Sequence, residues 1–193
     1  ARLPAYATFL KNLRAELPAA LSLSITALPA WLTSPALESV LAQVDHSVLQ
    51  VHSVNHPALG LFEPKQAEKW AQAYALRSNK PFYLALPAYG MGLIENDDAV
   101  PLVESEVPLN TSAPLRELEA DPEQVAALSH ALESAPPKGL VGLIWFCLPL
   151  AGDRRAWPLR TLQAVINHEP LRAKVLLQNL HKGELHQLSL HNA

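Results

Sequence analysis

Three aromatic residues, Trp31, Tyr89 and Trp145, lie at or near the ends of short apolar runs. If these runs are strands that open into loops, their ends are where a parallel α/β sheet places its ligands. An aromatic face packs against the apolar C–H face of a pyranose, while neighbouring polar groups hold the sugar hydroxyls. The three rings therefore predict a platform for carbohydrate, although packing beneath a helix explains each of them equally well.

Gln50 and His52 add polar groups to this picture. They alternate with Leu49 and Val51, so both side chains should point to the same face of a strand. A histidine placed there would orient a substrate hydroxyl or a carboxylate, or transfer a proton. An interior histidine that is satisfied by its neighbours is the alternative interpretation.

Glycoside hydrolysis generally requires two carboxyl groups. None of the apolar runs carries Asp or Glu, and the acids nearest to their ends are Glu95, Asp97, Asp98 and Asp153, all in expected loops. Solvated acidic loops are the ordinary explanation for these four residues. The sequence therefore assigns no catalytic residue within the chain.

Several classes of function are disfavoured. The formal net charge is −3 and there is no basic run, which argues against nucleic acid as a partner. No apolar stretch reaches the roughly 18 to 20 residues of a membrane span. The histidines are not spaced as metal ligands, and no glycine-rich phosphate loop follows a strand, so we expect neither a metal nor a cofactor.

The elements that must position these residues form a regular series. Apolar runs predict four strands, and amphipathic patterns with Pro or acidic caps predict helices before and between them. The expected strands are Leu21–Leu28, Val48–Val54, the run that opens Pro81–Gly92, and Leu140–Leu148. The expected helices are Leu3–Leu17, Ser34–Gln43, Pro64–Leu76, Asp121–Glu133 and Trp157–Ile166.

This series predicts an α/β fold in which residues 1–169 form half of a (β/α)8 TIM-type barrel. Near-continuous apolar strands need cover on both faces, and four of them leave two open edges. The missing N-terminal half of the barrel, or a dimer partner at the sheet edges, would close them. The alternative is an open, doubly wound four-stranded sheet.

Two segments depart from the series. Gly90–Asp121 is acidic and contains three prolines, and it is expected to be a long loop or lid at the active-site end of the sheet. Residues 170–193 alternate with period two around His181-Lys182-Gly183, which predicts a β-hairpin and the start of a β-rich extension.

Several motifs in a fixed order resemble the bacterial DUF3142 family, whose function is unknown. These are Tyr6-x-x-Phe9-Leu10 in the first helix, then ALPAW, LQVH and ALPAYG, and then the strand with Trp145. The resemblance covers most of the chain and implies a glycoside-hydrolase-like barrel in the bacterial periplasm or cell envelope. Family members carry a Gln-x-Asp-x-Asp strand just ahead of the first helix, and this chain lacks it.

The resemblance therefore predicts a carbohydrate-active protein whose catalytic acids lie upstream of the chain, with a carbohydrate as ligand. A non-catalytic carbohydrate-binding or structural module is the alternative. The two differ in whether two carboxyl groups face each other at the barrel mouth.

Overall fold

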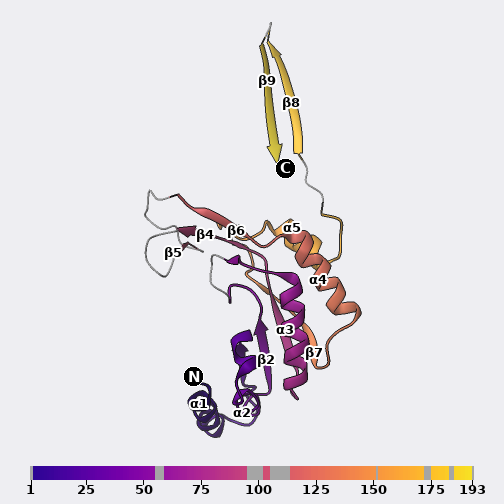
Figure 1. The fold of residues 1–193 in the computed structure, drawn as a ribbon. Helices are drawn as coiled ribbons and strands as arrows, with labels where there is room; N and C mark the ends of the chain where they lie inside the picture. The colour runs from indigo at the N-terminus through magenta and orange to yellow at the C-terminus, as the bar shows by residue number, and fades with distance from the viewer. Residues whose placement is uncertain are drawn as a thin grey trace.

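Four parallel strands form the central sheet, in the order β1-β2-β3-β7 (Figure 1). The computed structural model describes residues 2–54, 59–94, 102–104, 114–150, 152–171, 175–182 and 185–192. No helix in this part of the chain is long and apolar enough to cross a membrane. The elements are α1 (Leu3–Glu16), β1 (Ser24–Ala27), the 3-10 helix η1 (Pro29–Thr33), α2 (Leu37–Leu41), β2 (His46–Gln50), α3 (Pro64–Arg77), β3 (Phe82–Pro87), β4 (Gly90–Ile94), β5 (Leu102–Glu104), β6 (Arg116–Glu119), α4 (Pro122–Ser134), β7 (Leu140–Phe146), α5 (Leu159–Ile166), β8 (Val175–Lys182) and β9 (Leu185–Asn192).

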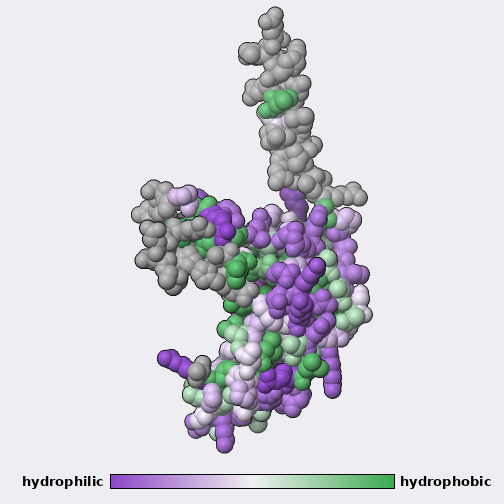
Figure 2. All heavy atoms as spheres, in the orientation of Figure 1, coloured by the Kyte–Doolittle hydropathy of each residue, from purple (hydrophilic) through white to green (hydrophobic). Residues whose placement is uncertain are grey.

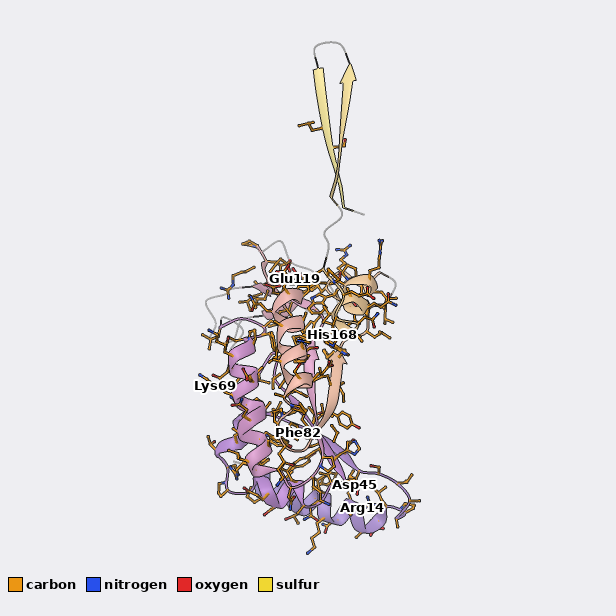
Figure 3. The ribbon with its side chains drawn as sticks, turned by 90° about the vertical axis from the view of Figure 1, so that its right-hand side faces the viewer. Arg14, Asp45, Lys69, Phe82, Glu119 and His168 are labelled. Carbon is orange, nitrogen blue, oxygen red and sulfur yellow. The ribbon has the colours of Figure 1, made fainter. Side chains whose placement is uncertain are left out.

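The helices cover one face of this sheet. Ile25, Leu49 and Leu84 point to that face and are buried. Thr26 and Val48 point the other way and are exposed and half-buried, respectively. In Figure 3 the helices accordingly lie in front of the strands. This one-sided cover is that of half a (β/α)8 barrel, as the sequence predicts, whereas the doubly wound alternative has helices on both faces.

Helices α3 and α4 begin with an acidic cap followed by proline. The Glu63 carboxylate accepts hydrogen bonds from the backbone N–H groups of Lys65 at 3.1 Å and Gln66 at 2.6 Å. The Asp121 carboxylate accepts one from the N–H of Glu123 at 2.9 Å. These bonds satisfy N–H groups that have no partner inside the helix, so both helices begin where the sequence predicts.

Several predicted boundaries are displaced, and those of α2 and β2 matter most for the site. Helix α2 occupies only the middle of the predicted Ser34–Gln43 helix, because the chain is extended at Ser34, where η1 ends. Strand β2 begins and ends earlier than the predicted Val48–Val54. His52 consequently lies two residues beyond the end of β2, where the chain has left the sheet.

An ion pair joins α1 to the start of β2. Arg14 donates to the Asp45 carboxylate at 3.2 Å, and Figure 3 shows the two side chains together at the end of α1. Asp45 also accepts a hydrogen bond from the backbone N–H of Leu23 at 2.7 Å. That bond, followed by the charge of Arg14, lowers the pKa of the Asp45 carboxyl. These contacts tie α1 to the amino end of the sheet.

The prediction of one long loop over Gly90–Asp121 is wrong for the part of this segment that the structure describes. Strands β4, β5 and β6 form an antiparallel sheet in the order β5-β4-β6. Gly90 is required there, because a Cβ atom would lie 2.8 Å from the carbonyl oxygen of Leu118. This small sheet follows β3 directly, at the carboxyl ends of the parallel strands (Figure 1).

Strands β8 and β9 form the predicted hairpin, with Val175 paired to Asn192 and Lys182 paired to Leu185. Figure 1 shows it extending away from the two sheets. The division into residues 1–169 and 170–193 stays a prediction.

Candidate functional site

A cavity of about 300 Å³ lies at the carboxyl ends of β2, β3 and β7, and we call it the strand-end cavity. Gln50 ends β2, Tyr89 follows β3 by two residues, and Phe146 ends β7. The segment between β7 and α5 forms another wall. The side chains that matter for chemistry are Gln50, His52, Tyr89, Phe146, Asp153 and Arg155.

His52, Tyr89 and Phe146 form one cluster in this cavity. Nδ1 of His52 lies 3.2 Å from the Tyr89 hydroxyl oxygen. The imidazole stacks on the Phe146 ring, with centroids 5.3 Å apart, and the Tyr89 ring meets Phe146 edge-on at 5.4 Å. His52 is only 2% exposed, whereas Phe146 is 47% exposed. The cluster thus presents one apolar ring to solvent above a buried polar pair.

Burial sets the protonation of this pair. Desolvation lowers the pKa of His52 to about 4, because the charged imidazolium loses its water. Desolvation also raises the pKa of Tyr89 to about 12, and the Ser53 side chain acts in the opposite direction. Both side chains are therefore neutral near pH 7, and both are available for hydrogen bonding.

One polar atom of the cluster has no hydrogen-bond partner among the described residues. Within the residues that the structure describes, the buried Nε2 of His52 has no hydrogen-bond partner. Gln50 does not supply one, since its amide donates to the backbone oxygen of His52 at 3.0 Å. A buried polar atom without a partner costs on the order of 1–3 kcal/mol, so a group from outside that pairs with it gains stability.

Arg155 fixes the wall of the cavity to the β4–β6 sheet. Its guanidinium donates to the Glu104 carboxylate of β5 at 2.5 Å and contacts the Glu117 carboxylate of β6. Gly92 of β4 makes room for it, because a Cβ atom there would lie 2.6 Å from Nη2 of Arg155. Asp153 accepts hydrogen bonds from the backbone N–H of Arg155, at 3.0 Å, and of Ala156. Arg155 is thus engaged with two carboxylates, and Asp153 is engaged with backbone groups.

The structure brings together three of the five residues predicted as ligand contacts, namely Gln50, His52 and Tyr89. Trp145 does not line the cavity. It pairs with Leu86, which is fully buried on the helix-covered face, and it packs against the core. Trp31 lies in η1, where its ring meets that of Tyr6 on α1 at 5.9 Å.

Phe146 was missed by the sequence analysis, which favoured its larger neighbour. Its strand position shows why it belongs to the site, since it pairs with Pro87 on the face that the helices leave open. Glu104 and Glu117 were missed as well, because their strands were expected to be loop. Of the acids that were considered, Asp153 holds backbone groups, whereas Glu95, Asp97 and Asp98 lie outside the described residues. Among the described His, Cys, Asp and Glu side chains, no three are placed to hold a metal ion.

The fold is similar to that of two bacterial enzymes of known structure. One is the spore cortex-lytic enzyme SleL of Bacillus cereus, at 14% identity and a TM-score of 0.56, with 89% of this chain and 46% of that chain covered. The other is the chitinase ChiA74 of Bacillus thuringiensis, at 13% identity and a TM-score of 0.51, with 97% of this chain and 45% of that chain covered. The chain thus spans about half the length of these enzymes. At this identity the likeness shows the fold alone.

Comparison by sequence gives the family. No curated protein matches the chain. The family model of DUF3142, a domain of unknown function, matches residues 1–151. Since this match spans well over half of the sequence, the chain belongs to the DUF3142 family.

Proposed function

We propose that the strand-end cavity binds carbohydrate, as part of a glycoside-hydrolase-like protein. The observation that carries this proposal is the half-exposed Phe146 ring, which lies against the buried pair of His52 and Tyr89. An aromatic face beside fixed polar groups matches the alternation of C–H faces and hydroxyls on a pyranose. The cavity volume of about 300 Å³ is at the small end of the range for ligand pockets, which suits a single ring of a longer glycan.

The catalytic acids are proposed to lie upstream of this chain. The described acids beside the cavity are already engaged, because Glu104 and Glu117 pair with Arg155 and Asp153 holds two backbone N–H groups. A general acid or nucleophile would have to leave those contacts. The one-sided sheet leaves room for further strands to bring acids to the same mouth. A periplasmic or envelope location stays a prediction.

The alternative is a module that binds carbohydrate or has a structural role without catalysis. The described acids beside the cavity are already bonded to other groups, and this observation supports a non-catalytic module as much as it supports catalytic acids upstream. Hydrolysis needs two carboxyl groups roughly 5 to 9.5 Å apart at the barrel mouth. If the intact protein binds a glycan but releases no reducing ends from it, the non-catalytic hypothesis is correct.

The proposal is tested by titrating the intact protein with chitin oligosaccharides, which are chosen because one protein of similar fold is a chitinase. Replacing Phe146 by Ala should weaken binding roughly tenfold, since a stacking face is lost. Phe9→Ala is the matched control, because Phe9 is 57% exposed on α1 and does not line the cavity. Equal affinities for Phe146→Ala and Phe9→Ala would rule out the strand-end cavity as the binding site.

A further inference from the structure

The hydrogen bond between Tyr89 and His52 links the hydroxyl hydrogen of Tyr89 to the tautomer of the imidazole. The Tyr89 hydroxyl keeps its proton near pH 7, because burial raises its pKa to about 12. The Ser53 side chain acts in the opposite direction, but burial has the larger effect on that pKa. The protonated Tyr89 hydroxyl therefore has one hydrogen to donate.

Nδ1 of His52 is positioned to accept that hydrogen. It lies 3.2 Å from the Tyr89 oxygen, and Tyr89 is 8% exposed, so its hydroxyl needs a partner within the protein. A neutral imidazole that accepts at Nδ1 carries its hydrogen on Nε2. Within the described part of the chain, nothing pairs with that Nε2. When Tyr89 donates to Nδ1, the cluster holds a neutral N–H donor that still needs an acceptor.

The charges around the cavity restrict which acceptor can approach. Among the described residues, Arg155 is the one Lys or Arg that lines it. Its guanidinium is already shared between Glu104 and Glu117, and Asp153 adds a further negative charge. The described residues that line the strand-end cavity thus offer an anionic sugar no unpaired cation, and an ammonium group has no lone pair to offer an N–H donor.

We propose that the cavity selects neutral glycans, and that glycan binding uncovers the buried Nε2–H of His52, which then donates to a hydroxyl or amide carbonyl oxygen of the bound sugar. Tyr89 is a positioning residue, since it holds the imidazole in the tautomer that donates at Nε2. This inference rests on the proposed carbohydrate function and narrows it to a class of ligand. It also assigns the donor atom to the protein and the acceptor atom to the sugar.

The tautomer can be measured without any ligand, by nitrogen NMR of the intact protein labelled at histidine. We expect His52, identified by the signal lost in His52→Gln, to be protonated at Nε2 and not at Nδ1. Tyr89→Phe should abolish that preference. Tyr83→Phe is the control, because Tyr83 packs edge-on against His46 elsewhere on the sheet, and it should leave the His52 signal unchanged. Protonation of His52 at Nδ1 in the wild type would overturn the proposal.

The ligand class is tested by calorimetric titration with neutral chitin oligosaccharides and with acidic oligogalacturonates. We expect the neutral glycans to bind and the acidic ones not to. Tyr89→Phe should weaken neutral binding roughly threefold to tenfold, the effect of one misplaced hydrogen bond, with the fold verified by circular dichroism. Preference for the acidic glycans, or unchanged binding by Tyr89→Phe, would overturn the proposal. Failure to bind any glycan would contradict the carbohydrate function, while the NMR result would still decide on the donor.

Discussion

His52 is a polar residue that the fold buries almost completely, and among the described residues it finds a partner at only one of its two ring nitrogens. Its position is held by Tyr89 through the hydrogen bond and by Phe146 through stacking. Because the imidazolium would lose its water there, folding stabilises the neutral form. The residue is therefore suited to donate a hydrogen bond near pH 7, and it is poorly suited to act as an acid in that range.

This preference makes folding stability depend on pH. The pKa of His52 is about 4 in the folded state, compared with 6.5 for the ordinary side chain, so the unfolded chain binds more protons between these values. Its contribution is fully present above pH 6.5 and is lost as the pH falls toward 4. We expect a loss of about 3 kcal/mol in the free energy of unfolding over this window, measured by denaturant titration.

His52→Leu should remove most of that slope, while carboxyls such as Asp45 act at lower pH, since their pKa is already lowered. If the wild type and His52→Leu lose stability in parallel between pH 6.5 and 4, His52 is not held neutral by burial.

Sequence patterns located some of the site residues and missed others for a definable reason. Gln50 and His52 alternate with apolar residues, so their shared face could be predicted. The strand with Trp145 and Phe146 is apolar at every position. Its hydrophobic pattern therefore does not show which side chains point toward the helices and which point toward the open face of the sheet. A shift of one residue along a strand moves a side chain to the opposite face. Only the pairing with β3 shows that Phe146 belongs to the cavity.

At the scale of elements, the β4–β6 sheet and the segment before α5 act as one unit. Arg155 joins two strands of that sheet, and its backbone oxygen accepts a hydrogen bond from Gly90 at 2.6 Å. The indole N–H of Trp157 donates to the carbonyl oxygen of Ala120 at 2.9 Å. These contacts hold a wall of the cavity in place from outside the parallel sheet.

Arg155→Met should therefore destabilise the protein by about 2–4 kcal/mol, because it removes the guanidinium from the nearly buried Glu104 carboxylate. The double variant Arg155→Met with Glu104→Gln should recover part of that loss, since no buried charge is then left. Thermal unfolding of the single and double variants measures both effects. Strictly additive losses would show that the two side chains do not act as a pair.

Helices were easier to predict than this small sheet, because their signals are local. Acidic caps followed by proline mark the beginnings of α3 and α4 within a few residues. Strand β4 contains Gly-Met-Gly and pairs with strands that lie farther along the chain. Neither its composition nor any neighbouring residue indicates that pairing. The acidic character of this segment is explained in part by the two carboxylates that bind Arg155.

At the scale of the whole molecule, the fold leaves one sheet face and two sheet edges without a partner within the described residues. Strands β1 and β7 are the edge strands. On β7, Ile144 is 38% exposed and Phe146 is 47% exposed. Figure 2 shows apolar residues reaching the surface on the left side of the view, beneath the β4–β6 sheet. Such a face and such edges are usually covered in a native protein.

If further strands close this half-barrel in the intact protein, backbone amides of β1 and β7 should resist hydrogen exchange as strongly as those of the central β2 and β3. Exchange followed by mass spectrometry compares the four strands in one experiment. Fast exchange confined to the two edge strands would show that the sheet stays open.

The most direct test of the carbohydrate-binding account is a crystal structure of the intact protein with a bound chitin oligosaccharide. We expect a sugar ring stacked on Phe146, with an oxygen atom within hydrogen-bonding distance of Nε2 of His52. A glycan bound elsewhere, with the strand-end cavity holding only water, would contradict the account.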